Sequence, residues 1–281
     1  MAYPIIDDLT GSFISVQGHL LPTDSEAAAA FMKPTESTMF YEFIRIVQGV
    51  PLFWEEHLAR LSLSIAGIIE LPGTLYADCR QLIAANGLMA ANLRLVLFDD
   101  LVVIHLTPSN YPPAELFDRG VPTGILNWER LDPHVKIIRS DYKAAISSRF
   151  AEPGPFGRFY ELLLADSQGF LTEGSRSNLF LIRDNQVLSA PESRILKGVT
   201  RKHVIEAINA SGAELVEEMQ TLPAIRAGSC EAAFLSSSPF DILPIRSIEE
   251  IELPSAENAL LRRIDQAYRA IVASYVGQRL A

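Results

Sequence analysis

The chain has 281 residues, of which 48% are hydrophobic and 21% charged, a composition typical of a globular protein with ample apolar material for a core. Its 24 basic and 34 acidic residues give a formal net charge of −10. This balance argues against nucleic acid or an anionic membrane as the main partner, because both favour clustered Lys and Arg.

The cysteines and the apolar runs indicate a cytoplasmic protein. Cys79 and Cys230 lie far apart and form no Cys-x-x-Cys pattern, so neither a disulfide framework nor a metal site is expected. No apolar run reaches the roughly 18 residues that a membrane helix needs. Residues 1–8 show neither the basic region nor the apolar run of a signal peptide.

The first part of the chain is predicted to mix strands with a helix. Strands are predicted at residues 40–48, 93–98 and 101–106. Asp99 and Asp100 separate the last two strands, as in a hairpin, and Gly49 supplies the turn after the first. An amphipathic helix is predicted at residues 54–69, with one apolar face formed by Leu58, Leu61, Ile65 and Ile68.

A segment rich in proline, residues 107–113, predicts a linker, because proline cannot continue a central strand. We therefore expect two domains, 1–112 and 113–281. In the second, strands are predicted at 124–128, 135–140, 159–165, 170–172, 178–182, 186–189, 231–236 and 242–244. Helices are predicted at 142–150, 200–210 and 257–276. This mixture, with strands outnumbering helices, indicates an α+β fold.

The stretch from Leu171 to Phe180, with the sequence LTEGSRSNLF, places one carboxylate, Glu173, on a polar turn between two apolar strands. A second segment, Ile195 to Arg201, runs through Gly198 directly into the helix predicted at 200–210. The first N–H groups of a helix lack partners within the helix, and the helix dipole is positive there, so such a start can bind phosphate.

Other residues could complete a phosphate site. Thr200 adds a hydroxyl at the helix start, and Ser237 and Ser238 follow an apolar strand. Arg60 lies off the apolar face of its predicted helix and could add a cation. A carboxylate and a phosphate site in one domain suit pyridoxal 5′-phosphate, which needs an acid partner for its ring nitrogen and an anchor for its phosphate.

This cofactor also needs a lysine amine. Lys136 lies in the apolar strand predicted at 135–140, where desolvation lowers the pKa of an amine and makes it a better nucleophile. Lys143 lies at the start of the helix predicted at 142–150, where a solvated position is easier to arrange. We favour Lys136, and Lys143 remains the alternative.

Together these segments resemble the class IV, or fold-type IV, pyridoxal-phosphate aminotransferases, which include D-amino-acid and branched-chain aminotransferases and aminodeoxychorismate lyase. The resemblance runs from about Tyr41 to Pro244. It is most specific at residues 173–180 and 196–201, and looser at 57–61 and 41–45. The family fold would be a small N-terminal α/β domain followed by a larger C-terminal pseudobarrel domain, usually in a homodimer.

The resemblance also implies roles for single residues. Lys136 would form the Schiff base and move the substrate proton, and Glu173 would pair with the ring nitrogen. Arg60, Val199, Thr200 and Ser238 would bind the phosphate, with Ser237 beside them, and Leu196 would pack on the ring. Tyr41 and Glu42 would contact substrate. The implied reaction is a ping-pong transfer of an amino group between an amino acid, D- or branched-chain, and a 2-oxo acid.

The chain departs from the family where substrate is bound. The D-amino-acid enzymes carry an Arg-x-His pair for the substrate carboxylate, and no such pair is found around residues 93–98. Arg94 is the nearest replacement, and Arg176 stands where that subfamily has Ser. A lyase that releases pyruvate from aminodeoxychorismate is the alternative activity; the lyases usually lack an acid at the position of Glu42, which counts against it.

Overall fold

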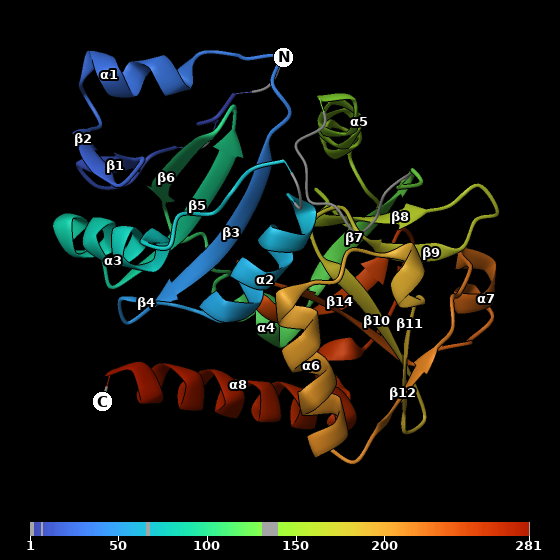
Figure 1. The fold of residues 1–281 in the computed structure, drawn as a ribbon. Coiled ribbons are helices and arrows are strands. Elements are labelled where there is room, and N and C mark those ends of the chain that lie inside the picture. Colours follow the sequence, from blue (N-terminus) through green and yellow to red (C-terminus); the bar gives the residue numbers. More distant parts are fainter. Residues whose placement is uncertain (1–2, 7, 66–67, 131–139, 281) are drawn as a thin grey trace. The chain divides into compact units, whose positions relative to one another are not determined.

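The computed structural model describes residues 3–6, 8–65, 68–130 and 140–280. Its elements are drawn in Figure 1. The chain forms two compact units. The first unit holds the described residues up to 110, residue 140 and residues 274–280. The second holds the described residues 111–130 and 141–273.

The first unit is built on an antiparallel sheet with the strand order β2-β1-β6-β5-β3-β4. The strands are β1 (Phe13–Val16), β2 (His19–Pro22), β3 (Phe40–Val47), β4 (Val50–Pro51), β5 (Ala90–Phe98) and β6 (Leu101–Thr107). The predicted hairpin at Asp99 and Asp100 is confirmed, with φ angles of +46° and +60° at these residues. Two consecutive positive φ angles suit the right-handed twist of the strands that the turn joins.

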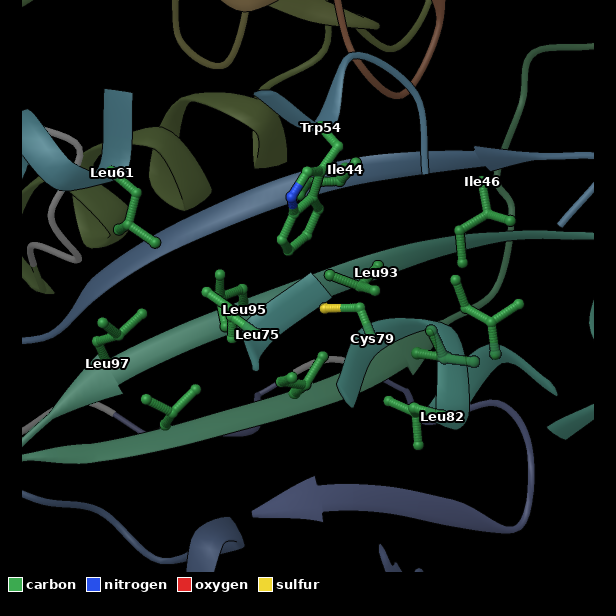
Figure 2. Packing of buried hydrophobic residues seen from close by; sticks show 14 of the residues in the cluster. Ile44, Ile46, Trp54, Leu61, Leu75, Cys79, Leu82, Leu93, Leu95 and Leu97 are labelled. Atoms are coloured by element: carbon green, nitrogen blue, oxygen red, sulfur yellow. The ribbon is translucent and has the colours of Figure 1, made fainter. Parts of the chain in front are cut away.

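Helices α2 (Trp54–Ser64) and α3 (Leu75–Asn86) supply the apolar side chains that cover one face of this sheet. Figure 2 shows Trp54 and Leu61 from α2, and Leu75, Cys79 and Leu82 from α3, gathered against the strands. Their partners on the sheet include Ile44, Ile46, Leu93, Leu95 and Leu97. Alternation along each strand places these residues on a single face. The short helix α1 (Glu26–Ala29) and the turn η1 (Ala30–Met32) precede β3.

The predicted helix at residues 54–69 is shorter than expected, since α2 ends at Ser64. Ser62 and Ser64 each donate a side-chain hydrogen bond to the carbonyl four residues earlier, at distances of 2.9 and 3.0 Å. Such bonds compete with the helical pattern. Ile65 is buried, but Ile68 is 62% exposed, so the prediction that Ile68 belongs to the buried face is wrong.

The second unit is built on a larger mixed sheet with the order β12-β11-β10-β13-β14-β7-β8-β9, and β15 pairs with β14. Its strands are β7 (Val121–Asn127), β8 (Glu161–Ala165), β9 (Leu171–Gly174), β10 (Asn178–Arg183), β11 (Gln186–Ser189), β12 (Glu214–Glu217), β13 (Ala232–Ser237), β14 (Asp241–Ile248) and β15 (Ile251–Glu252). The pairs β7·β8, β7·β14 and β11·β12 are parallel. A continuous cluster of buried side chains, including Leu163, Leu181, Leu235 and Leu243, lies along these strands.

The helical elements after residue 110 are α4 (Ala114–Arg119), α5 (Ser140–Ala151), η2 (Glu192–Arg194), α6 (Val199–Ala210), α7 (Leu222–Arg226), η3 (Ser255–Glu257) and α8 (Ala259–Leu280). The three predicted helices correspond to α5, α6 and α8, and the prediction of an α+β fold is confirmed. The strand predicted at 135–140 lies outside the described residues except for Ser140, which begins α5. Among the helices that the structure describes, none is long and apolar enough to cross a membrane.

Candidate functional site

The carboxylate of Glu173 lies at the centre of a buried polar cluster in the second unit. Glu173 is on β9, next to β8, and is 2% exposed. One carboxylate oxygen, Oε1, lies 2.7 Å from Nε of Arg130, which follows β7. The other, Oε2, accepts the backbone N–H of Leu196 at 3.1 Å and lies 3.5 Å from Nδ2 of Asn178. Three separate segments of the chain therefore hold this one carboxylate.

Opposing influences set the protonation of Glu173. Burial raises the pKa of its carboxyl group to about 7, and the charge of Glu161 adds to that rise. The Arg130 guanidinium and the N–H of Leu196 lower the pKa of Glu173. A carboxyl group poised near neutrality can bind a proton-bearing partner and responds strongly to a change in the charges around it.

The turn that follows Glu173 is held by a second buried carboxylate. Glu161 on β8 is fully buried and accepts the hydroxyls of Ser175 and Ser177 at 2.5 and 3.0 Å. The N–H of Gly174 donates to the carbonyl of Ser177 at 2.8 Å. A side chain at Gly174 would overlap the Ser177 hydroxyl, so only glycine fits there. These contacts fix the backbone that carries Glu173.

Asn178 joins the surroundings of Glu173 to the segment that leads into α6. Its Nδ2 donates to the carbonyl of Leu196 at 2.9 Å. Its Oδ1 occupies the space that a side chain at Gly198 would need. The backbone of Leu196 is thus held at both its N–H, by Glu173, and its carbonyl, by Asn178.

Hydroxyl groups lie together at the N-terminal end of α6. Gly198 precedes Val199, the first residue of α6, and has no side chain that could cap the helix. The hydroxyl of Thr200, which is buried, lies 3.3 Å from the hydroxyl of Ser238. Ser237 donates to the carbonyl of Arg176 at 2.8 Å. The structure therefore brings together Thr200, Ser238 and the N-terminal end of a twelve-residue helix, an arrangement that favours an anion.

Arg176 connects the turn after Glu173 to the serine segment. Its side chain is 57% exposed, donates to the carbonyl of Tyr160 at 2.8 Å and lies 3.5 Å from Glu161.

Of the two candidate lysines, Lys136 lies outside the described residues. Lys143 is exposed on α5. Its neighbour Tyr142 donates its hydroxyl to the carbonyl of Ser175 at 2.8 Å, so the first turn of α5 lies beside the turn that follows Glu173.

In the first unit, Glu42 forms a separate ionic cluster with α2. Arg60 donates from Nε to Oε1 of Glu42 at 2.8 Å and from Nη2 to Oε2 of the same carboxylate. Nδ1 of His57 lies 2.7 Å from Oε2. Glu42 and His57 are each 1% exposed. His57 and Arg60 are three residues apart, so they lie on the same side of the helix.

Tyr41 and Glu42, which were both predicted to contact substrate, point to opposite faces of the sheet, as neighbouring strand residues do. Tyr41 lies with Arg94, whose guanidinium is 4.8 Å from the centre of the Tyr41 ring. Arg94 pairs across the hairpin with His105. His105 is fully buried, and burial and the charge of Arg94 lower its pKa to about 3. The chain thus has an arginine and a histidine side by side, on two strands rather than one.

Three residues of the Glu173 cluster, Arg130, Glu161 and Asn178, were not predicted as site residues from the sequence. Arg130 lies in a short polar segment after β7, where nothing local distinguishes it from a surface cation. Glu161 could have been recognised, because it is a single acid within the predicted apolar strand 159–165. Within the described ranges, no group of three or more His, Cys, Asp and Glu side chains is arranged to hold a metal ion.

The chain is similar to known aminotransferases. The family model described as amino-transferase class IV matches residues 39–248. The branched-chain-amino-acid aminotransferase of Escherichia coli (strain K12) is 26% identical over 240 residues, which are 76% of this chain and 76% of that protein. The D-alanine aminotransferase of Bacillus licheniformis is 25% identical over 230 residues, covering 74% of this chain and 78% of that protein.

A solved structure shows the same fold. It is the branched-chain aminotransferase of the thermophilic archaeon Thermoproteus uzoniensis with norvaline, which superposes with a TM-score of 0.76 at 21% identity. The match covers 94% of this chain and 96% of that chain. Both units of the present chain therefore have counterparts in that protein.

Proposed function

The chain belongs to the class IV aminotransferases, and from this premise we propose that it uses pyridoxal 5′-phosphate to move an amino group between an amino acid and a 2-oxo acid. The observation that carries the proposal is the hydrogen bond from Leu196 to the buried carboxylate of Glu173. This hydrogen bond joins an acid that suits the ring nitrogen to the segment that leads into the proposed anion site at Thr200.

The residues present fit this cofactor. A pyridine nitrogen that carries a proton needs a buried acceptor, and the carboxyl group of Glu173 is buried, with a pKa raised to about 7 by that burial. A phosphate needs donors, and the hydroxyls of Thr200 and Ser238 lie together at the start of α6. The cofactor, when bound, supplies an electron sink for the bonds at the substrate α-carbon.

Each of these residues would have its own role in binding the cofactor. Glu173 would accept the hydrogen bond of the ring nitrogen and so keep the proton there. The N–H groups of Val199 and Thr200, with the hydroxyls of Thr200 and Ser238, would hold the phosphate, and Ser237 would support this turn. Leu196 would pack on the ring. Arg60 is proposed as a further phosphate cation, and its guanidinium already binds Glu42 in a fork.

A lysine amine is needed to bind the cofactor and to move the substrate α-proton. Sequence reasoning favours Lys136, whereas the contact of Tyr142 with Ser175 supports Lys143, the residue next to it. We expect one of the variants Lys136→Ala and Lys143→Ala to lose turnover and its visible absorption, and the other to keep both. If both variants stayed fully active, neither lysine would have this role.

The proposed substrates are D- or branched-chain amino acids with a 2-oxo acid as acceptor. Relatives of both classes support this proposal, a branched-chain-amino-acid aminotransferase at 26% identity and a D-alanine aminotransferase at 25%. Tyr41, Glu42, Arg94 and Arg176 are the proposed substrate residues. A panel of D- and L-amino acids, each assayed with pyruvate and with 2-oxoglutarate, would identify the class. Turnover that needs no 2-oxo acid would indicate the alternative, a lyase that releases pyruvate.

We also propose a cytoplasmic homodimer, in keeping with the acidic composition and the two free cysteines, Cys79 and Cys230, both of which are buried. Light scattering during size-exclusion chromatography would measure the mass in solution. A mass of 31.0 kDa would contradict the dimer.

A further inference from the structure

We propose that Arg130 is a positioning residue for Glu173: it keeps the Glu173 carboxylate ionised and aimed, and acts through Glu173 rather than on substrate. The inference rests on the proposed function, in which Glu173 pairs with the ring nitrogen of pyridoxal 5′-phosphate.

Both oxygens of the Glu173 carboxylate have a partner. Nε of Arg130 lies 2.7 Å from Oε1 of Glu173, and the side chains are 20% and 2% exposed. Oε2 of Glu173 is already engaged by the backbone N–H of Leu196. With one oxygen held by a backbone group and the other by a guanidinium, the carboxylate plane is fixed. The contact is a close ion pair to a nearly fully buried carboxylate, and two opposite charges attract more strongly there than at the protein surface.

Arg130 is itself held in place by an aromatic side chain. Its guanidinium carbon lies 5.4 Å from the centre of the Tyr142 ring. The Tyr142 ring packs against Trp128, with 5.3 Å between their centres, and the Tyr142 hydroxyl donates to Ser175. The same tyrosine therefore supports both the cation and the turn that follows Glu173. This support restricts Arg130 to the neighbourhood of the carboxylate.

Neighbouring charges act on the Glu173 carboxyl group in opposite directions. The charged groups that act on Glu173 are Glu161 on β8 and Arg130 after β7; Asn178 on β10 and the N–H of Leu196 contribute dipoles, and Tyr142 on α5 faces Arg130. Burial and Glu161 raise the pKa of Glu173, and Arg130 opposes them. Without Arg130 the carboxyl group would be mostly protonated at neutral pH. A protonated Glu173 has no negative charge with which to keep a proton on the ring nitrogen, and its neutral oxygen is a weaker acceptor than the carboxylate.

The test uses the full chain stripped of cofactor and titrated with pyridoxal 5′-phosphate between about pH 6 and about pH 9, a range that spans this group's transition. Arg130→Met removes the charge at similar length, and Arg130→Lys keeps the charge without the planar fork. Glu173→Gln removes the titrating group. Arg119→Met on α4, an exposed arginine outside the cluster, is the matched control.

We expect Arg130→Met to weaken binding about tenfold or more at neutral pH, because each unit of pKa shift changes the ionised fraction by up to tenfold. Its affinity should recover as pH rises, since Glu173 then ionises. Arg130→Lys should lie between Arg130→Met and wild type. In the Glu173→Gln background, Arg130→Met should add nothing. A full additional loss there, or an Arg130→Met profile equal to that of Arg119→Met, would overturn the inference.

Thermal unfolding of the stripped protein gives a readout without cofactor. The folded-state pKa of Glu173, about 7, exceeds its ordinary value of 4.5, so the folded chain keeps a proton that the unfolded chain has lost. Its contribution to stability therefore falls as pH rises through that interval. In Arg130→Met this loss of stability should continue to higher pH. In Glu173→Gln this contribution to the pH dependence of stability should be absent. The pH profile of stability of each chain is compared with that of the same chain carrying Glu173→Gln. If wild type and Arg130→Met then gave identical differences, the ion pair would have no effect on the ionisation of Glu173.

The two proposals fail in different ways. If the wild-type chain does not bind pyridoxal 5′-phosphate, the proposed function fails, and the unfolding profiles still decide whether Arg130 controls the ionisation of Glu173. If the wild type binds the cofactor and Arg130→Met behaves as the control does, the inference about Arg130 fails and the proposed function stands.

Discussion

Two buried carboxylates, Glu42 in the first unit and Glu173 in the second, each lie beside an arginine, but their donors come from different distances along the chain. Among the described contacts of Glu42, His57 and Arg60 come from one helix, α2. The described contacts of Glu173 come from three separate segments, through Arg130, Leu196 and Asn178. The first cluster joins α2 to its sheet, whereas the second brings three distant segments together at one carboxylate.

The same substitution at both positions should change stability to different extents. Glu173→Gln should lower turnover by about a hundredfold or more, because a neutral amide cannot keep a proton on the ring nitrogen by charge. Its thermal stability should change less than its turnover, since the amide keeps the shape of the side chain and its oxygen can still accept the N–H of Leu196. Steady-state kinetics and thermal unfolding on one preparation would measure both. Full turnover in Glu173→Gln would remove Glu173 from the site.

Glu42, a proposed substrate residue, also pairs with α2, so Glu42→Gln should destabilise the first unit as well as lower turnover. The side chain of Arg60 is 11% exposed, and its charge would lose its carboxylate partner inside the protein. Breaking such a buried pair typically costs about 3 kcal/mol. Chemical denaturation would measure the free energy of unfolding. A variant with wild-type stability but lost turnover would show that Glu42 acts only on substrate.

Thr200→Val should produce the smallest effect of the three. The substitution keeps the shape of the buried side chain but removes the hydroxyl that faces Ser238. A hydrogen bond to a charged group is worth about 1.5–3 kcal/mol, so the affinity for pyridoxal 5′-phosphate should fall by about tenfold or more. Thr74→Val, at an exposed position before α3, is the matched control. Equal affinities for the two variants would remove Thr200 from the phosphate site.

Local patterns in the sequence predicted much of the second unit. Strands β9 and β10 and the helix after Gly198 lie close to their predicted ends, because alternation and turn residues act over a few positions. Glu173, predicted on the turn between the two strands, is instead part of β9, which continues to Gly174. Helix α3 was missed although Leu75, Cys79, Leu82 and Ile83 follow the helical period. The short strands β1 and β2 were also missed, since four residues leave little pattern to detect.

Contacts between distant segments could not be predicted in this way. Arg130 and Glu173 are separated by 43 positions, and no local period relates them. An Arg-x-His pair was sought within residues 93–98 and not found there, whereas the hairpin places Arg94 opposite His105 of the next strand. Both pairings depend on strand order and register, which arise from the packing of the whole sheet.

The most direct test of the account is the visible absorption spectrum of the purified chain with pyridoxal 5′-phosphate, recorded before and after an amino-acid mixture is added, and again after a 2-oxo acid. We predict a yellow protein whose absorption band shifts with the amino acids and returns with the 2-oxo acid, as expected for an aminotransferase with cofactor at Glu173. A chain that stays colourless after incubation with the cofactor would contradict the proposed site and leave only the fold.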